Sequence, residues 1–168
     1  VTFTYDANNQ VTSSTDEAGV VTSYEYDSMG RITRASDTAG NTMTYEYDIS
    51  GNLVKQTDTI GRSAVYEYDR FNRLTAVTGT DLATTRYAYD TLDRLTGITL
   101  ADNTATIYEY DKTGNLIKTT EPGEAVYTYT YDAISRLTGK VDPLGAATRF
   151  VYDPAGNLTG TTDAEGAE

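Results

Sequence analysis

The chain has 168 residues, a net charge of −12 at pH 7, and no Cys, His or Trp. Without thiols and imidazoles it lacks disulfides, thiol nucleophiles, imidazole bases and nearly all zinc and copper chemistry. The acidic balance argues against nucleic acid or an anionic membrane surface as a partner, because like charges repel. No apolar stretch approaches the roughly 20 residues of a membrane span, so we expect no membrane insertion.

A tandem repeat dominates the sequence. A Tyr-Asp pair recurs every 21 residues without insertion or deletion, with a second aromatic two residues before each of these tyrosines and an aliphatic residue six residues after it. Self-similarity at a fixed period is the signature of a repeat architecture. The structural repeat positions that we assign are Tyr5, Asp6, Tyr26, Asp27, Tyr47, Asp48, Tyr68, Asp69, Tyr89, Asp90, Tyr110, Asp111, Tyr131, Asp132, Tyr152 and Asp153, with the aliphatic residues Val11, Ile32, Leu53, Leu74, Leu95, Leu116, Leu137 and Leu158.

The period divides the chain into eight repeats: 1–21, 22–42, 43–63, 64–84, 85–105, 106–126, 127–147 and 148–168. Terminal repeats of a free-standing array are normally atypical and polar. Here, however, both the opening residues from Val1 to Asp6 and the segment from Phe150 to Asp153 resemble interior repeats. We therefore expect these residues to be a segment of a longer array, or one unit of an assembly that continues end to end.

Each repeat predicts two strands and two turns, as the third one illustrates. Residues 44–47 alternate polar and aromatic side chains, which is the period of a half-buried strand. They lead into the first turn, Asp48-Ile49-Ser50-Gly51, where Asp suits the opening position of a type I turn and Gly a left-handed, bulge-forming fourth position. The chain returns from Leu53 to Thr57 and meets the second turn, Asp58-Thr59-Ile60-Gly61.

The fold class predicted by this pattern is all-β, a continuous antiparallel meander of about sixteen short strands with no helix. Turns ten or eleven residues apart leave strands of about six or seven residues. Open sheets rarely exceed about ten strands without curling or splitting. We therefore expect the sheet to coil into a shell wall or tubular spiral, with its aromatic face covered by coiling or by another chain.

The turns vary along the chain. The chemistry of the second turn drifts at 79–82, 100–103 and 121–124, which indicates the more exposed or more tolerant edge. Four first turns carry another residue in place of glycine: Asn9, Asn72, Asp93 and Ser135. Asn and Asp tolerate positive φ, so most of these exchanges are expected to keep the turn.

Eight aspartates in register could suggest a metal site, but their spacing argues against one. Successive Tyr-Asp carboxylates lie two strands apart, about 9.6 Å. A calcium ion needs six to eight oxygens within about 2.6 Å. The favoured interpretation is that each Asp accepts backbone N–H bonds in its own turn. We assign no metal ligand, no cofactor and no catalytic residue.

The aromatic residues predict one face of the sheet. Tyr45 and Tyr47 point to the same face, and Leu53 is expected there after the turn. Cross-strand aromatic and aliphatic pairs ordinarily hold a sheet together, so a packing role is favoured over a sugar-binding surface. Because the column is Tyr rather than Phe, and a tyrosine hydroxyl needs a partner or water, we infer a partly wet face.

The charged residues predict a solvated face. Glutamates stand between the two aromatics of several repeats, where alternation places a side chain on the outward face: Glu25, Glu46, Glu67 and Glu109. Arginines recur after the first turn and are expected to pair with acidic neighbours: Arg31, Arg73, Arg94 and Arg136.

The pattern Tyr-x-Tyr-Asp-x-x-Gly-Arg/Asn-Leu, followed by Thr-Asp-x-x-Gly, resembles the RHS or YD repeat over the whole chain. Residues 43–53 (Met-Thr-Tyr-Glu-Tyr-Asp-Ile-Ser-Gly-Asn-Leu) and 26–32 lie close to its consensus. The resemblance implies bacterial cell-surface or secreted proteins, toxin-complex components and polymorphic toxins, with teneurins as animal members. It also implies a long β-sheet that spirals into a hollow shell, which in the toxins encloses a C-terminal toxic domain.

The toxin members of this family carry a core-associated region rich in Asp-Pro-x-Gly, whose catalytic aspartates cleave the cargo from the shell. Residues 142–145 and 153–156 resemble fragments of it. Both stand at ordinary turn positions of the repeat, so no protease role is assigned to them.

Three functions are compatible with these observations, and none is enzymatic. The first is a structural repeat protein that forms the β-sheet wall of an extracellular filament or hollow shell, by self-association or continuation of the same array. The alternative is a casing segment of a secreted toxin, with the enclosed toxic domain as partner. A weaker alternative is a surface adhesin that binds glycans. All three place the protein outside the cell or at its surface.

Overall fold

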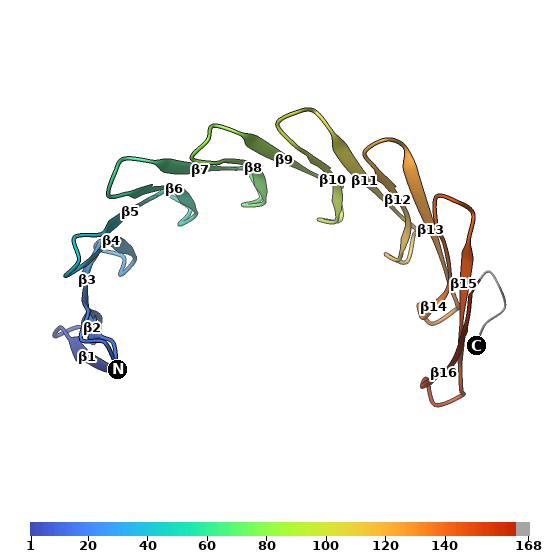
Figure 1. Cartoon of the computed structure of the whole chain (residues 1–168), viewed down its shortest axis with the longest axis horizontal. Coiled ribbons are helices and arrows are strands. Elements are labelled where there is room, and N and C mark those ends of the chain that lie inside the picture. Colours follow the sequence, from blue (N-terminus) through green and yellow to red (C-terminus); the bar gives the residue numbers. More distant parts are fainter. Residues whose placement is uncertain (164–168) are drawn as a thin grey trace. The chain divides into compact units, whose positions relative to one another are not determined.

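A computed structural model describes residues 1–163. These residues form sixteen strands joined by turns and contain no helix. The strands make one antiparallel sheet in which each strand neighbours the next in sequence, from β1 to β16 (Figure 1). The predicted sixteen-strand meander is confirmed. No helix in the described residues is long and apolar enough to cross a membrane.

Each repeat contributes one odd-numbered and one even-numbered strand. The odd strands, which carry the aromatic residues, are β1 (Thr2–Tyr5), β3 (Val21–Tyr26), β5 (Thr42–Tyr47), β7 (Ser63–Tyr68), β9 (Thr84–Tyr89), β11 (Ala105–Tyr110), β13 (Ala125–Tyr131) and β15 (Ala147–Tyr152). The even strands, which all begin at the aliphatic residue, are β2 (Val11–Thr15), β4 (Ile32–Asp37), β6 (Leu53–Asp58), β8 (Leu74–Thr78), β10 (Leu95–Thr99), β12 (Leu116–Glu121), β14 (Leu137–Val141) and β16 (Leu158–Thr162).

The chain divides into two compact units, Val1–Thr85 and Arg86–Glu168. The boundary falls inside β9, and each unit is described by itself below. The expected last repeat, 148–168, runs past the described part of the chain, because residues 164–168 lie outside it.

The first turn has the geometry that its sequence predicts. In the third repeat the N–H of Asp48 donates to the carbonyl of Asn52 at 2.9 Å, and the N–H of Gly51 donates to the carbonyl of Asp48 at 3.1 Å. Gly51 is left-handed, with φ of 94°. Asn9, Asn72, Asp93 and Ser135 take the same left-handed position in their turns, with φ between 61° and 64°. Their side chains therefore keep the turn, as expected.

A β-bulge follows each first turn. Tyr47 lies opposite Leu53, but Glu46 lies opposite Lys55, so Val54 is an extra residue on β6. The same shift occurs in all eight hairpins that contain a first turn. Such bulges bend the strand and increase its twist. They also move the residues after the aliphatic position to the other face. Several strands have only four or five residues, fewer than the expected six or seven.

Two second turns place an unsuitable residue type at a position with positive φ. Leu82 and Glu124 occupy left-handed positions, each with φ of 64°, where the other repeats of this edge use Gly or Asn. A left-handed backbone costs an ordinary residue about 1–2 kcal/mol, because Cβ crowds the following carbonyl. Both residues lie in the three repeats whose second turns drift in sequence.

Replacing Leu82 by glycine should stabilise the protein by about 0.5–1 kcal/mol. Relief of the left-handed backbone outweighs the greater freedom that glycine gives the unfolded chain. Urea denaturation measures the change. The matched control is Leu92→Gly, since Leu92 is an exposed turn leucine that does not have positive φ. A stabilisation of equal size in both variants would contradict the backbone explanation.

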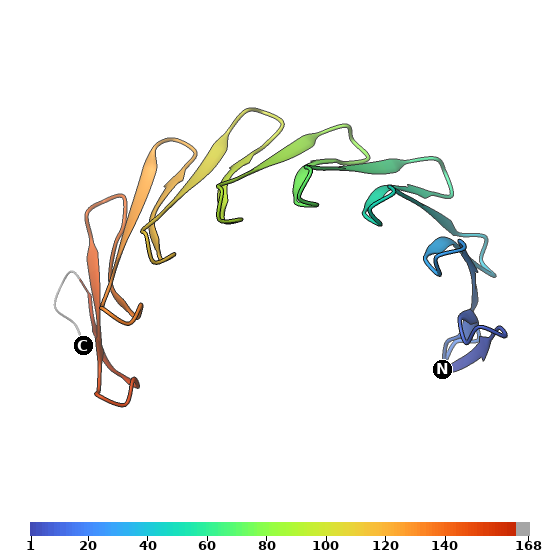
Figure 2. The same cartoon turned by 180° about the vertical axis from the view of Figure 1, so that it is seen from behind.

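Within each unit the sheet is a single layer, and no second layer formed by residues 1–163 covers either of its faces (Figure 1, Figure 2). Among the described residues only Ala64, Ala76 and Thr119 are buried. The tyrosines of β3 to β13 are half-buried, whereas Glu25, Glu46, Glu67 and Glu109 are exposed. The two faces therefore differ as predicted, and the tyrosines of the aromatic face are half-buried rather than enclosed in a core.

Candidate functional site

The Tyr-Asp aspartate organises the first turn. Oδ1 of Asp27 accepts the backbone N–H groups of Met29 at 2.9 Å and Arg31 at 3.0 Å. Its Oδ2 accepts Nε of Arg31 at 2.7 Å, and the Nη2 group of the same arginine lies 2.7 Å away. Both oxygens are therefore used inside one turn, which confirms the interpretation of these residues as turn-forming.

The residue four positions after the aspartate varies, but its role is preserved. In the third repeat Asn52 replaces arginine, and its Nδ2 donates to Oδ2 of Asp48 at 2.9 Å while its backbone N–H donates to Oδ1 at 2.8 Å. Arginine pairs with its own turn's aspartate in the repeats that carry it, through Arg31, Arg73, Arg94 and Arg136. The expected acidic partners of these arginines are thus confirmed.

These contacts stabilise the charged form of the carboxylates. The pKa of Asp27 is lowered chiefly by the backbone N–H of Arg31. The pKa of Asp111 falls from 3.8 to about 2, first because the Thr113 hydroxyl donates to it at 2.7 Å and then because Asn115 donates as well. A folded-state pKa below the unfolded value means that the contribution to stability is present above pH 3.8 and is lost as the pH falls through about 2.

The carboxyl group of Asp111 should titrate with a midpoint near pH 2 in the folded chain. An NMR pH titration that follows the chemical shift of its carboxyl carbon measures this midpoint. In the Thr113→Val variant the midpoint should move upward toward 3.8, because the largest single cause of the low pKa is removed. A midpoint near 3.8 in the unmodified protein would contradict the hydrogen-bonding scheme.

The tyrosines of five Tyr-Asp pairs link their repeat to the one before it. The hydroxyl of Tyr47 donates to the carbonyl of Ile32 at 2.8 Å, fifteen residues earlier. The equivalent bonds run from Tyr26 to Val11, from Tyr68 to Leu53, from Tyr110 to Leu95 and from Tyr131 to Leu116, at 2.7–3.0 Å. The tyrosine hydroxyl was expected to need a partner, and in these repeats that partner is the backbone carbonyl of the aliphatic residue in the preceding repeat.

Arginine after the first turn makes a second link, toward the following repeat. The guanidinium carbon of Arg31 lies 4.5 Å from the ring centroid of Tyr47, and Nη1 donates to the carbonyl of Asp48 at 3.3 Å. Arg94 does the same with Tyr110 and Asp111, and Arg136 with Tyr152 and Asp153. Sequence periodicity places these arginines in a column, but it does not show that they reach the next repeat.

The opposite face of the sheet carries cross-strand ion pairs. Lys55 lies 3.2 Å from Glu46, Lys118 lies 2.7 Å from Glu109, and Arg34 lies 3.5 Å from Glu25. The partners face each other directly in the strand register. These side chains are well exposed, so each pair adds at most about 1 kcal/mol.

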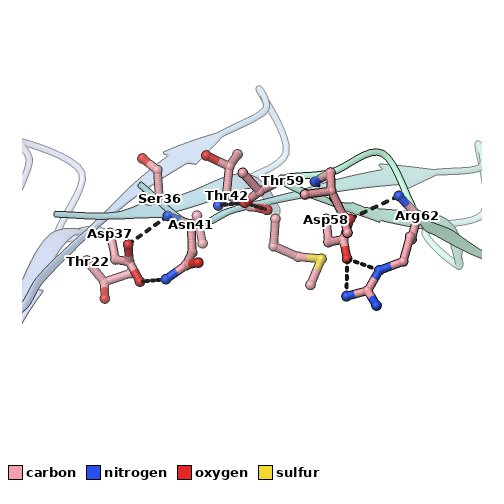
Figure 3. Close-up of a pocket in the computed structure, with 11 residues that line it drawn as sticks. Thr22, Ser36, Asp37, Asn41, Thr42, Asp58, Thr59 and Arg62 are labelled. Carbon is pink, nitrogen blue, oxygen red and sulfur yellow. Dashed lines mark hydrogen bonds and ion pairs between the residues drawn. The ribbon is translucent and has the colours of Figure 1, made fainter. Parts of the chain in front are cut away.

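A crevice of about 450 Å³ lies in the first unit between two neighbouring second turns (Figure 3). Asp37 accepts Nδ2 of Asn41 at 2.7 Å on one side, and Asp58 accepts Nε of Arg62 at 2.7 Å on the other. Thr59 bridges the two turns through its contacts with the backbone of Thr42. The two aspartates of the crevice are thus engaged within their own turns, and Thr59 joins the adjacent repeats.

The assigned repeat positions lie at the first-turn end of each hairpin. The tyrosines end the odd strands, the aspartates open the turns and the aliphatic residues begin the even strands. Within residues 1–163 no three acidic side chains come together in a way that could hold a metal ion. The repeat positions therefore serve to join neighbouring repeats, through the same types of contact in several of them.

This repeating hairpin has a counterpart in known proteins. The profile of the teneurin YD-shell matches residues 1–162. The chain belongs to the teneurin YD-shell family. No curated protein matches it.

Parts of two solved structures have the same fold as most of this chain. The crystal structure of TcdB2-TccC3-Cdc42 superposes with a TM-score of 0.73 at 21% identity, covering 86% of this chain and 9% of that one. The Tc holotoxin pore of Photorhabdus luminescens superposes with a TM-score of 0.70 at 21% identity, covering 85% and 9%. This YD-shell segment thus has the fold of those regions and spans about a tenth of the length of the chains that it matches.

Proposed function

We propose that this chain is a segment of the wall of a secreted, hollow YD shell that encloses a toxic domain. The observation that carries the proposal is the likeness of its single-layer meander to the TcdB2-TccC3 complex, together with the family match over residues 1–162. Among the functions weighed from the sequence, this likeness favours the toxin casing over the extracellular filament.

The wall role follows from how the repeats are fastened. Backbone pairing joins neighbouring repeats, and tyrosine hydroxyls and bridging arginines strengthen several of these junctions. The same types of contact recur in both units, so such a sheet can be extended without a separate core. A sheet built in this way suits a thin, continuous wall, and it needs neither cofactor nor catalytic group.

The test is made on the full-length protein secreted by its source. Electron microscopy should show closed hollow particles, and a protease should degrade the C-terminal domain only after the particles are opened by denaturant. Long filaments, or a C-terminal domain that is cleaved at once in intact particles, would overturn the casing. Cleavage of an unfolded control protein in the same sample verifies that the protease is active.

A further inference from the structure

The crevice between the second turns of the second and third repeats has a planar polar group at each end. Nδ2 of Asn41 donates to Oδ2 of Asp37 at 2.7 Å, and Nε and Nη2 of Arg62 both lie 2.7 Å from Oδ2 of Asp58. Asn41 and Arg62 occupy equivalent positions of successive repeats, and both side chains lie on the same side of the sheet (Figure 3). The amide and the guanidinium are therefore two strands apart, about 9.6 Å.

The floor of the crevice is apolar and belongs to the aromatic face. In the strand register Ala35 lies directly opposite Tyr24 on one side and Met43 on the other, so the three side chains share one face. Ala35 and Met43 both line the crevice, which has a volume of about 450 Å³. The thioether of methionine is polarizable and makes favourable contacts with aromatic rings. The floor is thus suited to an aromatic group.

Arg62 differs from the other arginines that pair with the aspartate four residues earlier. Arg31, Arg94 and Arg136 make the same ion pair, and each has a tyrosine ring of the next repeat 4.5–4.8 Å from its guanidinium carbon. In the part of the chain that the structure describes, no ring lies over Arg62. Its side chain is exposed by 62%, against 27% for Arg31. The guanidinium of Arg62 is therefore oriented by Asp58 but has a free face.

The spacing between the two planar groups fits one aromatic ring. A ring midway between Asn41 and Arg62 would lie about 4.8 Å from each. The ring of Tyr152 lies at the same distance, 4.8 Å, from the guanidinium carbon of Arg136. Guanidinium groups stack on aromatic faces through their planarity and positive charge. The crevice can thus hold a ring in the way in which the chain already holds its own tyrosines.

The remaining polar groups indicate what should be attached to the ring. Because Nδ2 of Asn41 faces Asp37, Oδ1 of Asn41 points away from that carboxylate and can accept a further hydrogen bond (Figure 3). A backbone N–H is a suitable donor. Two carboxylates and one guanidinium leave the crevice with a net negative charge, which disfavours an anionic ligand. A neutral aromatic residue within a polypeptide meets these requirements.

We propose that this crevice binds an aromatic side chain of a partner polypeptide that lies along the aromatic face. The ring occupies the space between Asn41 and Arg62, against Met43, and the backbone N–H of the same residue donates to Oδ1 of Asn41. This site goes beyond the proposed wall function and does not depend on it.

Methionine-methyl NMR tests the site, because the chain has only two methionines. The protein, labelled with carbon-13 in its methionine methyl groups, is titrated with N-acetyl-tyrosinamide. The Met43 methyl resonance should move upfield and saturate, with a dissociation constant in the millimolar range expected for one side chain on an open surface. Met29 is the internal control, since it lies in a first turn outside the crevice and should not move.

Two further probes define the ligand. N-acetyl-leucinamide has the same backbone without a ring, and 4-methylphenol has the ring without a backbone. Both should bind at least several-fold more weakly than N-acetyl-tyrosinamide. Equal binding by the leucine probe would overturn the aromatic site, and equal binding by 4-methylphenol would overturn the assignment to a polypeptide. A Met43 shift that follows protein concentration alone would assign the crevice to a second copy of this chain and likewise overturn the proposal.

A pair of arginine variants tests the stacking. Arg62→Gln should weaken the binding of N-acetyl-tyrosinamide several-fold, because it removes the charged planar group. Arg34→Gln is the matched control and should bind as the unmodified protein does, since Arg34 is also exposed but pairs with Glu25 on the opposite face. Circular dichroism verifies that both variants fold. An unchanged dissociation constant in Arg62→Gln, or equal shifts of Met29 and Met43, would contradict the site.

Discussion

The Tyr47→Ala variant should be destabilised by about 2–3 kcal/mol. The substitution removes a half-buried ring, the hydroxyl bond to the carbonyl of Ile32 and the surface on which Arg31 stacks. A fully buried aromatic truncated to alanine costs about 3–5 kcal/mol, and half-burial reduces that figure. Urea denaturation measures the total, and hydrogen exchange should locate the loss in β4 and β5.

A more conservative change separates the hydroxyl from the ring. Tyr47→Phe should cost about 1 kcal/mol, the usual net contribution of one hydrogen bond. Tyr45→Phe is the matched control, since the structure shows no bond for the Tyr45 hydroxyl within the described residues. Equal losses in the two phenylalanine variants would contradict the inter-repeat role of Tyr47.

Gly51→Val should destabilise the protein by about 1–2 kcal/mol. Gly51 has φ of 94°, and a β-branched residue is strongly disfavoured at positive φ. A Cβ at this position would meet only Nη1 of Arg31 at 3.8 Å, an ordinary contact, so the cost comes from the backbone.

The control for this prediction is Gly51→Asn, which should cost only a few tenths of a kcal/mol. Asn72 already occupies the equivalent position of the next repeat with φ of 61°. Equilibrium unfolding in urea compares the two variants. If valine and asparagine prove equally harmful, crowding rather than backbone conformation would be the cause.

The periodic features of this protein were predictable because they are local. An Asp-x-x-Gly segment forms a turn from its own residues, as the bonds within 48–52 show. Alternation in 44–47 predicts a strand without reference to the rest of the chain. The turns in which Asn72 and Asp93 stand in place of glycine were also predictable, because Asn and Asp tolerate positive φ.

The links between repeats were not predictable, because each depends on distances across the sheet. The tyrosines were expected to need hydroxyl partners. Only the strand register with its bulge brings the hydroxyl of Tyr47 within reach of the carbonyl of Ile32. The stacking of Arg31 on Tyr47 has the same origin. The left-handed backbone of Leu82 was not predictable either, because leucine has no preference for positive φ.

By itself, the sequence determined the repeat, the strand order, the turn chemistry and the division of the sheet into aromatic and charged faces. Each of these depends on residue spacing and on backbone preferences over a few residues. Only the tertiary structure decided how the repeats are fastened together and which apolar side chains stay exposed at the turns. Those features are set by the bulged register, which fixes where side chains from neighbouring repeats meet.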